Sequence, residues 1–109
     1  MDFSMDTLYD EPNNRWMVAL KGEVDIFNSQ DMKTRLNGLL QERQIDLYLD
    51  CKDLEYLDST ALGSLVGVLK NVKDYEGEMH LMSIRPNLLK LFRITNLDKV
   101  FVIEGDGHA

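Results

Sequence analysis

Hydrophobic and polar residues alternate in two short runs near the start of the chain, at 3–9 and 16–20. A turn-like polar cluster at 11–14 separates the two runs. Alternation of this kind is typical of a strand with one buried face, and a short turn between two such strands favours an antiparallel pair. The chain is therefore expected to open with a β-hairpin.

Farther along, the hydrophobic spacing switches between that of helices and that of strands. Over 28–43 hydrophobic residues recur at i, i+4, i+7 and i+8, which predicts an amphipathic helix capped by Asn28 or Ser29. Over 60–73 they surround most of the circumference, which indicates a largely covered helix. The other expected elements are strands at 45–51, 79–84 and 100–103 and a helix from Pro86 to about Ile94.

This order of elements, β-β-α-β-α-β-α-β, predicts how the strands pair. Each later strand is reached through a helix, so the right-handed crossover rule places it parallel to the strand before it. The expected fold class is α/β. It is a single domain over 1–109 with a mixed, mostly parallel sheet, an N-terminal antiparallel hairpin and a loose tail at 104–109.

The amino-acid composition limits the kinds of partner and the compartment that we expect. A chain of 109 residues, 44% hydrophobic and 28% charged, has room for one core. Its net charge of -7 argues against binding to a phosphate backbone, so no nucleic-acid partner is expected. The sequence shows no secretory signal and no apolar run long enough to insert into a membrane. Its single cysteine, Cys51, cannot form an internal disulfide and is interpreted as a buried residue. We therefore expect a cytoplasmic protein.

Patterns that carry enzyme chemistry are missing. The two histidines, His80 and His108, lack the spacing of a metal site, and no phosphate-binding glycine motif occurs. We therefore predict no catalytic residue, no metal and no cofactor, and a protein that binds rather than catalyses. Gly63 and Gly67, four residues apart, are interpreted as a place of close helix packing.

A cluster of hydroxyl and carboxyl side chains, Asp58, Ser59 and Thr60, comes directly before the second predicted helix. One interpretation is purely structural, because Asp, Ser and Thr are preferred caps for the unpaired N–H groups of a helix start. Local chemistry alone favours that interpretation.

The segment from Asp58 to Gly63, with the sequence Asp-Ser-Thr-Ala-Leu-Gly, also closely resembles the phosphorylation motif of the STAS domain in anti-sigma factor antagonists. The resemblance extends to three other segments, at 22–25, 77–79 and 86–92, and so covers nearly the whole chain. One departure is Ala61, where many members have glycine; this change bears on how closely a partner approaches rather than on the fold.

The resemblance implies a partner switch. The unphosphorylated protein would bind an anti-sigma factor that is also a serine kinase, releasing sigma factor, and phosphorylation by that kinase would end the binding until a PP2C-type phosphatase reverses it. The implied phosphoacceptor is Ser59, with Thr60 as the competing site. The implied partner-binding residues are Asp25, Asp58, Ser59, Thr60, Leu62 and Gly63.

The sequence is compatible with alternative interpretations. The chain could be a STAS subunit that never switches, a scaffold in a lipid-transport or signalling complex, whereas a hydrolase that uses Ser59 lacks a histidine placed to activate it. Asp25 is either a turn or cap residue or a partner contact. Ile26 and Phe27 are either exposed anchors or core residues, and we expect core.

Overall fold

The chain opens with the predicted hairpin. In the computed structural model, which describes residues 2–104, β1 (Phe3–Asp10) pairs antiparallel with β2 (Arg15–Val24). The other strands are β3 (Asp46–Leu57), β4 (Met79–Met82) and β5 (Val102–Glu104), and each lies parallel to the strand before it. The sheet order is β1-β2-β3-β4-β5. The predicted mixed, mostly parallel sheet is confirmed.

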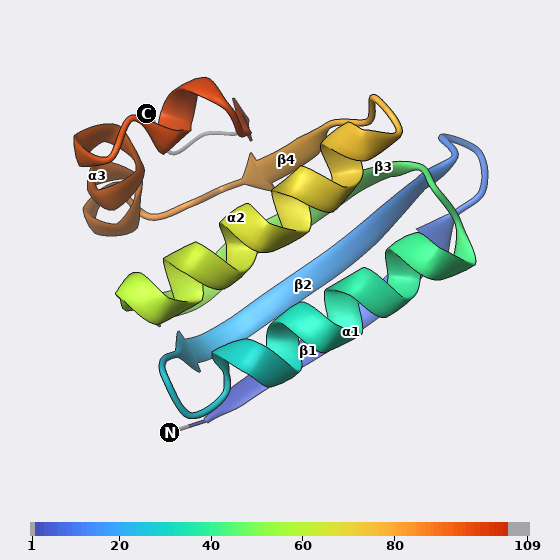
Figure 1. Ribbon diagram of the computed structural model, residues 1–109. Helices are drawn as coiled ribbons and strands as arrows, with labels where there is room; N and C mark the ends of the chain where they lie inside the picture. Colours follow the sequence, from blue (N-terminus) through green and yellow to red (C-terminus); the bar gives the residue numbers. More distant parts are fainter. Residues whose placement is uncertain (1, 105–109) are drawn as a thin grey trace.

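Two long helices lie side by side on one face of this sheet, as Figure 1 shows. They are α1 (Ser29–Glu42) and α2 (Ser59–Asp74), and the shorter α3 (Pro86–Ile94) lies beyond the carboxyl end of β4. A 3-10 turn, η1 (Leu97–Lys99), leads into β5. The buried residues between the sheet and the two long helices include Val18, Leu20, Leu47, Leu49, Leu81, Met32, Leu36, Leu65 and Val68. This core holds α2 against the sheet, and α2 begins directly after the carboxyl end of β3.

The opposite face of the sheet is not covered by α1 or α2 (Figure 1), and we call it the open face. Along β3 and β4 the residues that alternate with the core residues point to it, as the two-residue period of a strand requires. Tyr48 and His80 lie there side by side, one on each strand.

Several predicted boundaries need correction, and β3 needs the largest one. It continues past Cys51 to Leu57, where a loop was expected. Its pairing with β2 shifts register twice, each time with one extra residue on β3. Beyond Cys51 the inward-facing residues are therefore Leu54 and Leu57, three apart, and this spacing does not resemble a strand.

Smaller corrections concern the other element ends. β4 ends at Met82 because Ser83 adopts a left-handed φ of 56°, and β5 begins at Val102 because the chain first forms η1. Asn28 stands at the N-cap of α1, but its side chain makes no cap hydrogen bond there. Glu104 belongs to β5 and not to a tail, and residues 105–109 lie outside the described part of the chain.

Within residues 2–104, none of the helices combines the length and the hydrophobicity needed to cross a membrane.

Candidate functional site

The site is built on the carboxylate of Asp58, the N-cap residue of α2. Its backbone is extended, and its Oδ1 accepts a hydrogen bond of 2.9 Å from the N–H of Ala61. The hydroxyl of Thr60 donates to the same oxygen at 2.5 Å. The capping interpretation of the sequence is therefore right for Asp58, because this carboxylate satisfies an N–H group that the helix itself leaves unpaired.

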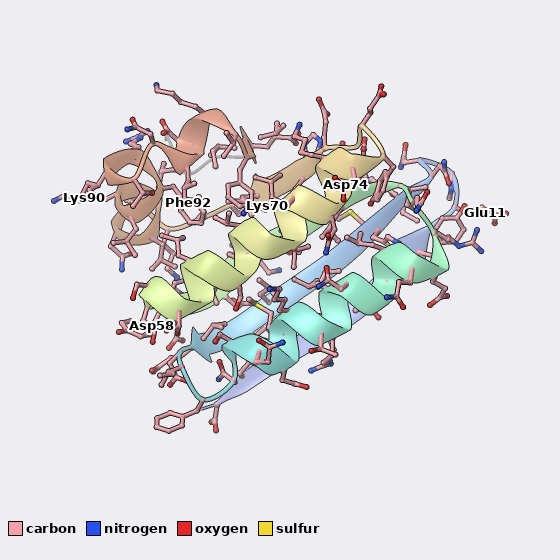
Figure 2. The ribbon with its side chains drawn as sticks, in the orientation of Figure 1. Glu11, Asp58, Lys70, Asp74, Lys90 and Phe92 are labelled. Carbon is pink, nitrogen blue, oxygen red and sulfur yellow. The ribbon has the colours of Figure 1, made fainter. Side chains whose placement is uncertain are left out.

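The same carboxylate joins α2 to the loop between β2 and α1. Oδ2 of Asp58 accepts a hydrogen bond of 3.1 Å from the N–H of Ile26, and Figure 2 shows Asp58 at the amino-terminal end of α2 beside that loop. The hydrogen bonds from Thr60, Ala61 and Ile26 hold the pKa of Asp58 below its ordinary value. Asp58 is therefore ionised at neutral pH and holds two surface segments in a fixed relation.

Asp25 organises the β2–α1 loop from within. Its Oδ1 accepts from the N–H of Phe27 at 2.9 Å, and its own N–H donates to the side chain of Asn28, also at 2.9 Å. The Asn28 amide in turn donates to the carbonyl of Glu23 at 2.9 Å. Asp25 thus performs the turn role that the sequence left open, and its half-buried carboxylate remains beside the site.

Ser59 and Thr60 are both exposed, but their hydroxyl groups differ. The Thr60 hydroxyl is engaged with the Asp58 carboxylate. Among residues 2–104, none of the side-chain hydrogen bonds involves the Ser59 hydroxyl. Ser59 is the first residue of α2, so its oxygen lies at the positive end of the helix dipole and is open to a reagent.

Two hydrophobic residues of the same loop face solvent, contrary to our expectation. Phe27 is 91% exposed and Ile26 is 64% exposed, so the prediction that they belong to the core is wrong. The cause is the tight loop: the hydrogen bonds that Ile26 and Phe27 donate to Asp58 and Asp25 turn this segment away from the core. The flanking turn-forming residues, Asp25 and Asn28, were the available signal for this geometry.

The other predicted partner-binding residues divide between surface and core. Leu62 is only 9% exposed and belongs to the hydrophobic core, so its side chain offers little to a partner. Gly63 is exposed, and a Cβ built on it would meet nothing within 4 Å. The packing interpretation is therefore wrong for Gly63. It holds only for Gly67, which lies against the side chain of Lys33 in α1.

Comparison with known proteins decides the family. The family model of the STAS domain matches residues 8–108. The anti-sigma-B factor antagonist of Bacillus subtilis (strain 168) is 34% identical over 109 residues, which cover 100% of this chain and 97% of that protein. The chain belongs to the STAS domain family. A second relative of this STAS domain, the anti-sigma-B factor antagonist of Staphylococcus aureus (strain NCTC 8325 / PS 47), is 32% identical over 89 residues, 81% of this chain and 82% of the relative.

Solved structures agree with this assignment at the level of the fold. SpoIIAA, an anti-sigma factor antagonist, superposes on this STAS domain in its unphosphorylated form with a TM-score of 0.72 at 16% identity, covering 94% of this chain and 87% of SpoIIAA. Its phosphorylated form superposes with a TM-score of 0.70 at 17% identity, covering 94% and 91%. The family consists of regulatory binding proteins rather than enzymes, as the sequence predicted.

Proposed function

We propose that this STAS domain is an anti-sigma factor antagonist that is switched off by phosphorylation of Ser59. In its unmodified form it binds an anti-sigma factor that has serine kinase activity, and sigma factor is released. Phosphorylation by that kinase ends the interaction, and a PP2C-type phosphatase restores it. We place this cycle in the cytoplasm, where sigma factors act.

The accessible hydroxyl of Ser59 is the observation that carries the proposal. It lies on the first turn of α2, exposed and outside the hydrogen-bond network of Asp58. The Thr60 hydroxyl, by contrast, donates a hydrogen bond to the Asp58 carboxylate. A kinase that reaches this surface therefore finds Ser59 ready and Thr60 engaged. The relatives named anti-sigma-B factor antagonists, and the existence of SpoIIAA in both phosphorylation states, support the same assignment.

The fold tolerates a phosphate at this position. A phosphoserine carries roughly -1.5 to -2 charges, and an anion at a helix N-terminus is stabilised by about 0.3 to 1 kcal/mol. Ser59 is exposed, so the phosphate displaces no buried side chain. The modified protein should therefore keep its native structure, and the effect of phosphorylation should appear only when a partner binds.

At the interface the same phosphate opposes binding. Ser59 follows the ionised Asp58, so the modified helix start presents two adjacent anionic groups. A carboxylate of the partner about 5 Å from the phosphate, at an effective dielectric constant near 20, is repelled by about 3 kcal/mol for each unit charge. That energy corresponds to a more than hundredfold loss of affinity and outweighs the gain from the helix dipole.

The test is a phosphorylation assay with the anti-sigma kinase and ATP, followed by mass spectrometry of the intact protein and its peptides. We expect one phosphate, on Ser59, in the wild type and in Thr60→Ala, and none in Ser59→Ala. Ser64→Ala is a matched control, because Ser64 lies on the same helix farther from its start.

Two outcomes of this phosphorylation assay would contradict the proposal. Phosphate on Thr60, or modification that persists in Ser59→Ala, would overturn the site assignment. Binding to the anti-sigma factor with no phosphate transfer at all would favour the other possibility for this family, a STAS scaffold subunit of a lipid-transport or signalling complex that does not switch.

A further inference from the structure

A second cluster of polar side chains lies on the open face, at the other end of β3 from Ser59. It consists of Asp46 at the start of β3, Glu78 just before β4, and His80 within β4. One ligand atom from each of the three lies within 4.8 Å of the other two. The register of the parallel strands brings them together, because Leu47 pairs with Met79 and so places Asp46 next to Glu78.

The imidazole of His80 is held rigidly in this cluster. The residue is 5% exposed, and its ring stacks on that of Tyr48 with the centroids 3.9 Å apart and the planes 6° from parallel. The guanidinium of Arg15 covers the Tyr48 ring, with its Cζ 4.4 Å from the centroid. The His80 ring therefore has one orientation, in which its two nitrogens point to different carboxylates.

The hydrogen bonds of His80 determine where its proton lies. Nδ1 is hydrogen-bonded to the carboxylate of Glu104, and a carboxylate can only accept, so Nδ1 carries the proton. In the neutral ring Nε2 then presents a lone pair, and 3.1 Å away it faces Oε1 of Glu78, which is also an acceptor. Two acceptors this close repel each other, so either a proton on Nε2 or a metal cation must lie between them.

From this geometry we propose that Asp46, Glu78 and His80 bind a divalent transition-metal cation, Zn²⁺ being the best fit. Imidazole and carboxylate together suit Zn²⁺, which takes bonds of about 2.0 to 2.2 Å to both. Two atoms at these bond lengths and 3.1 Å apart form an angle of about 95° at the ion, close to that of a four- or five-coordinate site.

Glu104 completes the arrangement without being a ligand. A metal-binding histidine nearly always gives its other N–H to a carboxylate or carbonyl, which fixes the ring and raises its basicity. The side chain of Glu78 is 55% exposed, so an ion can enter from solvent and keep water as its remaining ligand. Bound metal would connect β3 to β4 directly and to the short β5 through His80 and Glu104.

The test is calorimetric titration of the full chain with Zn²⁺, in a His108→Ala background that removes the only other histidine. We expect one equivalent to bind, with a rise in the melting temperature. Asp46→Asn and Glu78→Gln should each weaken binding about tenfold or more, and Glu104→Gln about 10- to 100-fold. Glu76→Gln is the matched control, an exposed carboxylate two residues from Glu78 that should leave the affinity unchanged.

Nitrogen NMR of His80 in the same background avoids the risk that a substitution of this buried residue prevents folding. We expect the proton on Nδ1 and a Zn²⁺-dependent shift of the Nε2 resonance. The proposal is overturned if both nitrogens carry protons and their resonances do not shift when Zn²⁺ is added. It is also overturned if Mg²⁺ binds as tightly as Zn²⁺, or if Asp46→Asn and Glu78→Gln bind Zn²⁺ with the affinity of the parent.

Discussion

Phe27 is expected to be an anchor for the protein that binds at Ser59, and Phe27→Ala tests this. The ring is 91% exposed in a loop held by hydrogen bonds to Asp25 and Asp58, so it is available to a partner without the cost of ordering a flexible segment. Burying a phenylalanine side chain contributes about 2 kcal/mol, so Phe27→Ala should raise Kd roughly thirtyfold.

Calorimetry with the purified anti-sigma factor measures this change. Leu8→Ala is the matched control, because Leu8 is 64% exposed but lies on β1, where it points to the open face. Leu8→Ala should bind like the wild type, and both variants should unfold within about 0.5 kcal/mol of it, since neither side chain is in the core. An unchanged Kd for Phe27→Ala would show that Phe27 is not an anchor, and an equal loss of affinity for both variants would show that the effect is not specific to this loop.

Four further predictions concern stability and reactivity. The pKa of Asp58 is lowered from its ordinary value of 3.8, so the ionised carboxylate stabilises the fold above pH 3.8, and this stabilisation is lost as the pH falls further, toward the lowered pKa. In thermal melts the wild type should therefore lose more stability on acidification than Asp58→Asn. Burial raises the pKa of Cys51 to about 12, so a thiol reagent at neutral pH should label it only after denaturation. Gly22→Ala should lower the melting temperature, because Gly22 has a φ of 92° and its Cβ would lie 2.0 Å from the carbonyl oxygen of Asp2. Gly38→Ala should raise stability by about 0.5 to 1 kcal/mol, because Gly38 lies in α1 with nothing near its Cβ position.

Regular hydrophobic periodicity made most of the fold predictable. The hairpin and the two long helices follow from it, and the crossover rule supplied the parallel pairing. The second half of β3 was not predictable from periodicity, because two register shifts change the inward spacing there from two residues to three. Leu54 and Leu57 are buried strand residues whose spacing alone does not distinguish them from a helix.

The candidate site was predictable where it depends on local chemistry and not where it depends on distant pairing. Asp58 as a cap follows from its residue type and position, but its hydrogen bond to Ile26, 32 residues away, could not be foreseen. The same hydrogen bonds expose Phe27, which hydrophobicity alone assigned to the core. Asp46 and His80 also come together only through the pairing of β3 with β4. A search for metal-ligand spacing along the sequence therefore could not detect this cluster.

One phosphate on Ser59 should weaken partner binding more than a hundredfold while leaving the domain folded. The most direct measurement compares the affinity of the anti-sigma factor for the unmodified protein and for the homogeneous Ser59 phosphoprotein, with circular dichroism of both. Because a partner carboxylate would repel the phosphate by about 3 kcal/mol, we predict a more than hundredfold higher Kd for the phosphoprotein, with superimposable spectra. Equal affinities would show that the phosphate does not switch binding, and a phosphoprotein without the native spectrum would show that the fold does not tolerate it.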